Sequence, residues 1–583
     1  MREARRSIPL LTYALLLAGC SQAGPVESER PPPPAEPLAL STDKAAYRPG
    51  EAVALSLNRS AAAQARVRYK HLGRVVAEAA VSGSSWRWTP PAADFQGYLA
   101  ELYQVADGEE TVLAAVAIDV SSDWTRFPRY GFLSDFGKKD APAMQQVIAE
   151  LNRHHINGLQ FYDWHYAPHQ MLPASAASPP PSWTNIFGAE VQLATVAGYI
   201  RAAHERNMRA MFYNLIFGAL KDAGAAGVAD EWYLFTDPNR RTRDRHPLGP
   251  PFVSDIFLVD PANPAWQAYL GREVDRVYAA LEFDGFHMDQ LGERGRLYRY
   301  DGRPVDLAAS YEGFIRAMQQ RHPGKANVLN AVNQYGQPGI ARAPTPFLYT
   351  EVWAPNESYA DLARIIQEND ALSGGQKNTV LAAYVNYGLA DREGVFNTPS
   401  VLLADAVIFA FGGAHLELGE HLLGKEFFPN DNLAMRTDLK KALVSYYDFL
   451  VAYQNLLRDG GTFNTPRLTS SGALPLAAWP AQPGRIAFVG KEVGNRQVIH
   501  LLNFTDATTM SWRDDAGIQA YPTERKDLPF TLATDRPVER IWYATPDQEL
   551  GASRELQFSR SANEVSFALP FLKYWSMVVV EYR

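Results

Sequence analysis

Eight short apolar segments alternate with longer helical segments between residue 124 and about residue 460, and this rhythm constrains the fold most. The apolar segments span residues 129–136, 156–164, 208–217, 283–292, 326–333, 347–353, 379–387 and 406–418. Residues 141–154 and 191–206 show helical periodicity between them. Strands that alternate with helices are typical of a parallel sheet, and eight of them favour a (β/α)8 barrel. A doubly wound sheet would also be expected to carry a glycine-rich phosphate turn, and the sequence shows none.

Polar and aromatic residues recur where these predicted strands end. They are Asp135, Asp163, Trp164, Tyr213, His287, Asp289, Asn330, Asn333, Glu351, Trp353, Tyr384, Asn386, His415 and Glu417. Any one of them alone would more often be a cap or a satisfied core residue. Recurrence at nearly every strand end would require as many separate buried hydrogen-bonding arrangements. Since active sites of this barrel type lie at the carboxyl ends of the strands, we predict one shared ligand site.

Residues 283–292 carry two aspartates in an otherwise apolar strand. Left unpaired there, each carboxylate would cost several kcal/mol, so both need partners. Asp284 is interpreted as a structural partner at the start of the strand and Asp289 as a group at the mouth of the barrel. Alternation along the strand places His287 on the same face as Asp289. The alternative is that Asp284 caps the following backbone and that Asp289 begins a turn.

Two segments with short alternating strands flank the predicted barrel, which covers residues 122–460. Residues 38–121 contain apolar runs separated by turn signals such as Arg48-Pro49-Gly50. Residues 461–583 return to the same pattern. Both segments are predicted to be β-sandwiches.

Residues 1–20 have the form of an export signal. Arg2, Arg5 and Arg6 precede an apolar stretch over residues 10–17 that is too short to span a membrane. The ending Leu17-Ala18-Gly19-Cys20 resembles the lipobox of bacterial lipoproteins, which implies cleavage before Cys20, lipidation of its thiol and a membrane anchor. Ser21 resembles the pattern of lipoproteins sent to the outer membrane. The alternative is a plain secretory peptide; in either case the proline-rich residues 21–37 are expected to form an extended spacer.

Composition narrows the possible partners. Cys20 is the one cysteine, so no intrachain disulfide and no multi-cysteine metal site can form. No cofactor is expected and no set of metal ligands is evident, while the sequence leaves a structural calcium open. The net charge is −8 and no Lys/Arg stripe is present, which disfavours a nucleic-acid partner. The 12 Trp and 28 Tyr residues suit a carbohydrate ligand, because flat amphipathic rings stack on sugar faces. Nothing in the sequence indicates an oligomeric state.

Asp289 and Glu351 are the natural pair of catalytic carboxylates. Each ends an apolar strand in aromatic surroundings that can raise a pKa or stack on a ring. Paired carboxylates at one barrel mouth suit hydrolysis of a glycosidic bond, with one as nucleophile and the other as proton donor. Spacing alone does not assign the two roles.

Several longer blocks resemble the signature sequences of glycoside hydrolase family 66. They are Phe161-Tyr-Asp-Trp-His165, Phe283-Asp-Gly-Phe-His-Met-Asp-Gln-Leu-Gly292, Leu329-Asn-Ala-Val-Asn-Gln-Tyr-Gly336, Leu348-Tyr-Thr-Glu-Val-Trp353 and Gly413-Ala-His-Leu-Glu-Leu-Gly-Glu420 with Glu426-Phe-Phe-Pro-Asn430. That family holds endo-dextranases and cycloisomaltooligosaccharide glucanotransferases. The resemblance implies a multidomain chain in which an immunoglobulin-like module precedes the (β/α)8 barrel and a β-sandwich follows it.

The resemblance also assigns roles to the site residues. It implies retaining hydrolysis of α-1,6-glucan, with Asp289 as nucleophile and Glu351 as acid/base. From their positions we expect hydroxyl contacts or ring stacking from a further set: Asp163, Trp164, Tyr213, His287, Asn333, Trp353, Tyr384, Asn386, His415 and Glu417.

Two other functions are considered. A transglycosylase making cyclic or branched isomaltooligosaccharides would share the site, but the short spacing between the seventh and eighth strands leaves no room for the module inserted in the cyclising branch, which favours hydrolysis. A surface lipoprotein that binds glycan without cleaving it would share the anchor and the aromatic content. The presence of both carboxylates argues against such a binder.

Overall fold

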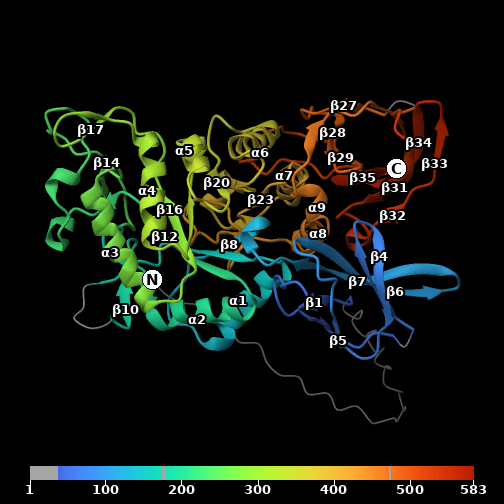
Figure 1. The fold of residues 1–583 in the computed structure, drawn as a ribbon, viewed down its shortest axis with the longest axis horizontal. Helices are drawn as coiled ribbons and strands as arrows, with labels where there is room; N and C mark the ends of the chain where they lie inside the picture. The colour runs from blue at the N-terminus through green and yellow to red at the C-terminus, as the bar shows by residue number, and fades with distance from the viewer. Residues whose placement is uncertain (1–36, 63, 174–178, 472–473) are drawn as a thin grey trace, which may run out of the picture. The chain divides into compact units, whose positions relative to one another are not determined.

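All eight predicted central strands occur in the computed structural model of the chain, and a helix follows each of them (Figure 1). The strands are β8 (Tyr130–Leu133), β9 (Gly158–Phe161), β12 (Arg209–Leu215), β16 (Gly285–Asp289), β19 (Ala326–Leu329), β20 (Leu348–Glu351), β21 (Thr379–Ala382) and β23 (Ala414–His415). The helices are α1 (Ala141–Arg153), α2 (Leu193–Glu205), α3 (Pro264–Ala280), α4 (Leu307–Arg321), α5 (Gln337–Arg342), α6 (Tyr359–Ser373), α7 (Thr398–Ala410) and α8 (Thr437–Ala452).

The structure describes residues 37–62, 64–173, 179–471 and 474–583. Leu38–Arg583 forms one compact unit. The predicted export signal, Cys20 and all but the last residue of the predicted spacer lie outside the described residues. Within the described residues, none of the helices has both the length and the apolar character needed to cross a bilayer.

The central strands are parallel and lie in chain order. Five form one sheet in the order β19-β16-β12-β9-β8, and three form a second in the order β20-β21-β23. A parallel bridge between Asn330 and Tyr349 joins β19 to β20. At the other edge the backbone N–H of Phe132 donates to the carbonyl of Leu418 at 3.0 Å, which links β8 to the chain just after β23. The two sheets are therefore connected at both edges.

The eighth strand is shorter than predicted. Residues 406–410 end α7, and β23 covers only Ala414–His415 within the predicted 406–418. Every residue of α7 is buried, so its sequence lacks the polar face that marks a surface helix. A helix buried all round and a buried strand cannot be told apart by periodicity.

Alternate strand residues pack on the two sides of the central strands. Tyr130, Val328, Tyr349, Val380 and Ala414 belong to a buried cluster between the strands. The opposite side chains pack against the helices; among them, the rings of Phe212 and Phe286 stack at 4.5 Å. Asp284 lies at the start of β16, where it accepts hydrogen bonds from the Ala210 backbone and pairs with His204, as the sequence predicted.

The flanking segments each form two sheets. In residues 40–120 the first sheet has the strand order β1 (Leu40–Thr42), β2 (Val53–Leu57), β5 (Ser85–Trp88). The second sheet has the order β4 (Arg74–Ala80), β3 (Arg66–His71), β6 (Gln96–Ala106), β7 (Glu109–Val120). Beyond the short α9 (Gln454–Leu457), one sheet holds β25 (Thr462–Asn464), β27 (Leu476–Ala478), β28 (Arg485–Val493), β29 (Arg496–Phe504), β35 (Trp575–Tyr582), β31 (Val538–Ala544) and β32 (Arg554–Glu555). The other holds β26 (Leu468–Thr469), β30 (Arg525–Ala533), β34 (Glu564–Leu572) and β33 (Phe558–Ser561). Each pair of sheets encloses its own buried apolar cluster.

The loops that follow the central strands contain short paired strands. The chain between β12 and α3 forms the sheet β13 (Gly218–Ala219), β15 (Ile256–Leu258), β14 (Arg245–His246), and the chain after β16 forms the hairpin β17 (Leu297–Tyr298), β18 (Pro304–Val305). Two further pairs are β10 (Ser182–Thr184) with β11 (Glu190–Gln192), and β22 (Gly394–Val395) with β24 (Leu433–Ala434).

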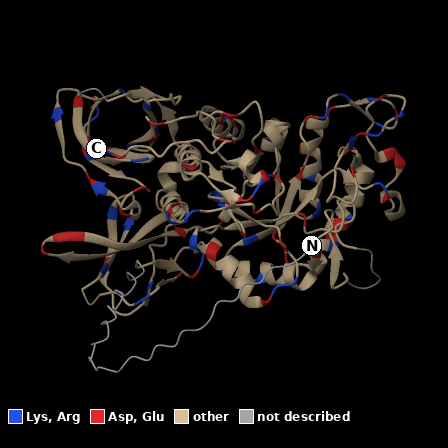
Figure 2. Ribbon diagram, turned by 180° about the vertical axis from the view of Figure 1, so that it is seen from behind, with Lys and Arg blue, Asp and Glu red and all other residues tan. Residues whose placement is uncertain are grey.

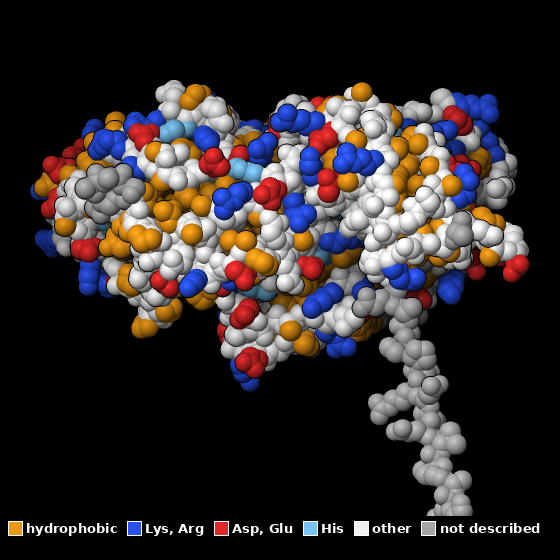
Figure 3. All heavy atoms as spheres, turned by 90° about the horizontal axis from the view of Figure 1, so that it is seen from below, with side chains coloured by type: hydrophobic (Ala, Val, Ile, Leu, Met, Phe, Trp, Pro, Cys, Tyr) orange, Lys and Arg blue, Asp and Glu red, His pale blue; other side chains and the backbone are white. Residues whose placement is uncertain are grey.

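Basic and acidic residues are interspersed along the ribbon (Figure 2). The face shown in Figure 3 likewise mixes both signs with apolar and uncharged side chains. The face in Figure 3 shows no single-signed basic surface of the kind that binds a nucleic-acid backbone.

Candidate active site

A pocket of about 340 Å³ lies at the carboxyl ends of the central strands. Seven of the predicted site residues line it: Asp163, Tyr213, His287, Asp289, Glu351, Trp353 and Tyr384. His287 and Asp289 share a face of β16, which confirms the alternation expected from the sequence. The tertiary structure thus brings together groups that lie up to some two hundred positions apart in the chain.

Asn330 joins the two carboxylates. Its Nδ2 donates to Oδ1 of Asp289 at 2.9 Å and to Oε2 of Glu351 at 3.1 Å, and its Oδ1 accepts from the backbone N–H of Glu351 at 3.1 Å. Because one nitrogen bonds both carboxylates, these two oxygens lie no farther apart than the sum of the two distances. The facing oxygens are thus close enough for the carboxyl separation of about 5–5.5 Å that is typical of retaining glycosidases, rather than the roughly 6.5–9.5 Å of inverting ones.

A tyrosine hydroxyl holds the outer oxygen of each carboxylate. Tyr213 on β12 donates to Oδ2 of Asp289 at 2.6 Å, and Tyr384 beyond β21 donates to Oε1 of Glu351 at 2.6 Å. Each carboxylate therefore has one tyrosine and the shared Asn330 as donors. This arrangement fixes both groups before any ligand arrives.

The two carboxyl groups differ in proton affinity. Burial and the charge of Asp289 raise the pKa of Glu351 to about 7. Burial also raises the pKa of Asp289, while the hydrogen bonds from Tyr213 and Asn330 lower it. Two like charges in one buried site cannot both form easily, so Asp289 ionises first and Glu351 keeps its proton near neutral pH.

A third carboxyl group, Asp163, lines the same pocket. It follows β9 with a φ of 44°, in the left-handed region that side chains rarely adopt. Burial and the charge of Asp289 raise the pKa of Asp163 to about 8. Its Oδ1 is buried and has no hydrogen-bond partner among the described residues. An oriented, neutral carboxyl group with a free oxygen suits hydrogen bonding to a ligand hydroxyl.

His287 forms part of the floor of the pocket. Its ring stacks on Tyr130 and Tyr213 and meets Tyr349 edge-on. Burial lowers the pKa of His287 to about 3, so the imidazole is neutral. It can offer a hydrogen bond without adding charge beside Asp289.

A family comparison agrees with this site. The model of glycosyl hydrolase family 66 matches residues 42–579. The chain belongs to this family. A cycloisomaltooligosaccharide glucanotransferase of Niallia circulans is 26% identical over 99% of this chain and 75% of its own length. A dextranase of Streptococcus salivarius is 24% identical over 83% of this chain and 67% of its own length.

A solved structure shows the same fold. The crystal structure of a Paenibacillus sp. cycloisomaltooligosaccharide glucanotransferase complexed with cycloisomaltoheptaose has a TM-score of 0.85 and 25% sequence identity. It covers 93% of this chain and all of its own chain. The likeness therefore extends over the flanking sheets of this family member as well as its central strands.

Three predicted ligand contacts lie outside the pocket. Trp164 is fully buried and packs against Trp183, Phe212 and Phe283, so it belongs to the core. Asn386 is also fully buried, where its Nδ2 donates to the carbonyl of Asp514 at 2.9 Å. Asn333 accepts from the backbone N–H of Trp353 at 3.1 Å and so shapes the loop that carries this ring. The structure does not bring these three side chains to the pocket, since each packs or forms hydrogen bonds within the protein.

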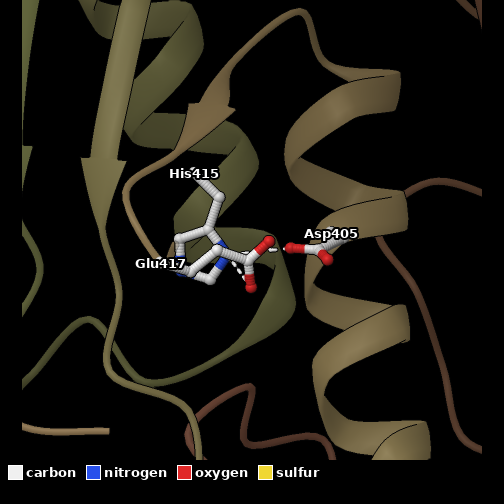
Figure 4. Close-up of side chains that lie close together, drawn as sticks. All are labelled: Asp405, His415 and Glu417. Atoms are coloured by element: carbon white, nitrogen blue, oxygen red, sulfur yellow. Dashed lines mark hydrogen bonds and ion pairs between the residues drawn. The ribbon is translucent and has the colours of Figure 1, made fainter. Parts of the chain in front are cut away.

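His415 and Glu417 do not line the pocket. Their side chains meet that of Asp405 (Figure 4). Ala414 and Leu416 face the interior of the central strands, so alternation turns His415 and Glu417 outward. There His415 Nδ1 lies 2.8 Å from Oδ1 of Asp405 and 3.3 Å from Oε2 of Glu417. The structure therefore does not place either residue where the predicted sugar contact would need it. Both residues instead hold β23 against α7.

This buried cluster is also the one set of metal-ligating side chains found among the described residues, a set that the sequence did not indicate. Its atoms lie within 4.8 Å of one another. Nε2 of His415 is bonded to the carbonyl of Ala383 at 2.8 Å and must donate there, which leaves Nδ1 for the carboxylates. Burial lowers the pKa of His415, but the charge of Glu417 and the bond to Asp405 outweigh it and raise the value to about 10. The donor set thus fits an imidazolium between the carboxyl groups of Asp405 and Glu417.

Asn330 and Asn333 were both predicted near the shared site, and Asn333 was named as the sugar contact, whereas the structure places Asn330 in the pocket. Both asparagines follow the same apolar run, but only Asn330 is at the end of β19, paired with Tyr349 of the next strand. Asn330 reaches the pocket because β19 ends at Leu329, directly before it. Periodicity in the sequence does not fix where a strand ends. Other lining residues that were not predicted come partly from the central strands, as Gln160, Leu215 and Tyr349 do, and partly from the connections between them: Ile186, His246, Leu248, Phe252, Ile256, Glu426 and Phe428. The pattern of the central strands does not mark the positions in these connections.

Proposed function

We propose that this protein is a retaining, endo-acting glycoside hydrolase that cleaves α-1,6-glucosidic linkages of dextran through a covalent glycosyl-enzyme intermediate. The observation that carries the proposal is the bridge from Asn330 to Asp289 and Glu351. It keeps the carboxylates too close for a water molecule to enter between sugar and base, as inversion requires. Retention, with a separation of about 5–5.5 Å, suits this geometry.

The residues divide the reaction between them. The carboxylate of Asp289 attacks the anomeric carbon while protonated Glu351 gives its proton to the departing glycosidic oxygen. The ionised Glu351 then takes a proton from a water molecule, whose oxygen attacks the same carbon and displaces Asp289. Tyr213 and Asn330 hold Asp289 in its ionised state before attack, and the pKa of Glu351 near 7 lets it give and regain the proton.

The finer architecture belongs to the same proposal. The eight parallel strands are interpreted as a (β/α)8 catalytic barrel over residues 122–460. An immunoglobulin-like β-sandwich over residues 38–121 precedes it, and a β-sandwich over residues 461–583 follows. Connection of the central sheets at both edges and the helix after every strand support this interpretation.

The proposed substrate is supported by the relatives, and the choice of hydrolysis over cyclisation is supported by one feature of the fold. A dextranase and a cycloisomaltooligosaccharide glucanotransferase both align with most of this chain, and both names concern α-1,6-glucan. A cyclising glucanotransferase is the second candidate, favoured by the high structural likeness to such an enzyme. Between β21 and β23 this chain holds only short elements and α7, with no inserted module, which favours hydrolysis.

Incubation with dextran, pullulan, starch and nigeran tests the proposal. We expect dextran alone to be shortened to oligosaccharides with reducing ends, which keep the α configuration when first released. Cyclic products without reducing ends would favour the glucanotransferase. Retention of dextran without any cleavage would instead point to a glycan-binding protein and overturn the proposal.

For localisation we propose export and a lipid anchor on Cys20, on the outer membrane. The support is the sequence of residues 2–20. Mass spectrometry of the mature protein is expected to find a diacylglyceryl group on Cys20. An unmodified Cys20, or processing that is insensitive to globomycin, would contradict this localisation.

A further inference from the structure

A long connection of the C-terminal sheets reaches the central barrel beside the catalytic pocket. It comprises residues 505–524 between β29 and β30 and contains no regular helix or strand. Ser511 forms an antiparallel bridge with Ser358, and the backbone N–H of Trp512 donates to the carbonyl of Glu357 at 3.0 Å. Connections of this length without secondary structure are uncommon in compact proteins and often carry a function.

Arg513 in this connection contacts the backbone on both sides of the proton donor. Its Nη2 donates to the carbonyl of Val352 at 2.9 Å, and its Nη1 lies 3.5 Å from the carbonyl of Tyr384. Val352 directly follows Glu351, and Tyr384 is the residue whose hydroxyl holds Oε1 of Glu351. One guanidinium therefore ties together the ends of β20 and β21 where Glu351 and Tyr384 meet.

The same guanidinium lies among aromatic rings. Its centre is 5.0 Å from the ring of Trp353, 5.3 Å from that of Tyr387 and 4.6 Å from that of Trp512. Trp353 lines the pocket, so the cation also holds a wall of the site. Arg513 is only 5% exposed, and among the described residues its guanidinium bonds backbone carbonyls, while the charges of Asp515 and Glu357 act on it from beyond ion-pair distance. Burying a cation with no carboxylate in contact is costly, and a role in the site accounts for that cost better than stabilisation of the fold does.

We propose that Arg513 is a positioning residue for the acid/base Glu351, supplied to the catalytic barrel by the C-terminal sheets. This role rests on the proposed function. Arg513 touches no substrate in this role; it fixes the separation of Glu351 and Tyr384 and the orientation of Trp353. The planar fork of arginine is needed, because a lysine can bond one carbonyl but cannot span two at this spacing.

The test compares Arg513→Met and Arg513→Lys with wild type on two substrates. Dextran needs a proton on its leaving oxygen, whereas isomaltotriosyl fluoride with added azide needs neither acid nor base assistance. We expect Arg513→Met to lower kcat on dextran by about 10- to 100-fold and to lower turnover of the fluoride by less than about threefold. Arg513→Lys should recover part of the dextran activity, and the alkaline limb of its pH profile should stay shifted from that of wild type.

Arg536→Met is the matched control. Arg536 lies over the ring of Tyr582 at 3.8 Å within the C-terminal sheets, so its removal should leave both substrates at wild-type rates. Equal losses on dextran and fluoride, or wild-type kinetics in Arg513→Met, would overturn the role of Arg513. A wild-type protein that cleaves the fluoride but not dextran would overturn the proposed substrate. The variants would then be compared on the fluoride without and with azide, because release of the intermediate by water still needs base assistance from Glu351, and Arg513→Met should lose more activity without azide.

Discussion

Tyr384 donates a hydrogen bond of 2.6 Å from its hydroxyl to Oε1 of Glu351. The bond stabilises the ionised carboxylate and so opposes the burial that raises the pKa of Glu351 to about 7. The tyrosine thereby sets how far the proton affinity of Glu351, the proposed acid/base, rises above that of an ordinary glutamate. Removing the hydroxyl should change this balance without changing the pocket.

Tyr384→Phe should move the alkaline limb of the activity profile to higher pH. Catalysis needs Glu351 protonated, so wild-type activity is expected to be present below pH 7 and to be lost as the pH rises through about 7. Loss of one bond to a charged group should raise that midpoint by about one unit. The measurement is kcat/KM against pH on dextran, with Tyr387→Phe as control. A midpoint that moves down would contradict the assignment of Glu351.

Azide should distinguish the roles of the two carboxylates. Asp289→Ala and Glu351→Gln are each expected to lower dextran cleavage by about 10⁴-fold or more. With isomaltotriosyl fluoride and azide, Glu351→Gln should yield the α-configured azide, because the intermediate on Asp289 still forms. Asp289→Ala should yield the β-configured azide by direct displacement. NMR of the products reads the configuration, and exchanged results would reverse the two roles.

Asn330→Ala should cost activity through both carboxylates at once. It removes the donor shared by Asp289 and Glu351, so both lose a bond that favours the ionised form. We expect kcat to fall by about 10²-fold or more and both limbs of the pH profile to move upward. Asn327→Ala is the matched control, because Asn327 on the same strand bonds Gln319 outside the pocket. Equal effects of the two variants would show that Asn330 has only a structural role.

Replacing Trp164 should affect mainly stability, whereas replacing Trp353 should affect mainly the KM for dextran. Trp164→Ala creates a cavity in the core and should lower the free energy of unfolding by about 3–5 kcal/mol, with kcat/KM of the folded protein little changed. Trp353→Ala removes part of the pocket wall and should raise KM by about 10-fold with a small loss of stability. Urea unfolding and dextran kinetics on both variants check this contrast. A raised KM in Trp164→Ala alone would restore its predicted contact with sugar.

The buried imidazolium of His415 should make stability depend on pH. Its pKa is raised to about 10, so its contribution is full below the unfolded value of about 6.5 and is lost as the pH rises through 10. Asp405, with a pKa raised to about 8 by burial and the charge of Glu417, acts in the same direction. His415→Gln should lower the free energy of unfolding by about 3–5 kcal/mol at pH 6 and flatten this dependence.

Urea unfolding between pH 6 and pH 10 measures the effect. His204→Gln is the control, because His204 pairs with Asp284 near the surface, where an ion pair contributes about 1 kcal/mol or less. A stability of His415→Gln equal to that of His204→Gln at every pH would contradict the charged cluster.

The local pattern of apolar and polar residues was enough to predict the central strands and the two candidate catalytic carboxylates. The alternation of apolar and helical segments placed all eight central strands, and the polar residues that follow them included Asp289 and Glu351. Period-two alternation also placed His287 beside Asp289. These features depend only on neighbours along one strand, so the sequence by itself contains them.

Tertiary structure decided which polar groups share the pocket. Alternation tells that His415 and Glu417 lie on one face of β23, but only closure of the sheets shows that this face meets α7. Asn330 became the bridge because β19 ends next to β20, and Arg513 reaches Glu351 from a connection far along the chain. Such choices depend on contacts between distant segments, and local periodicity carries no information about them.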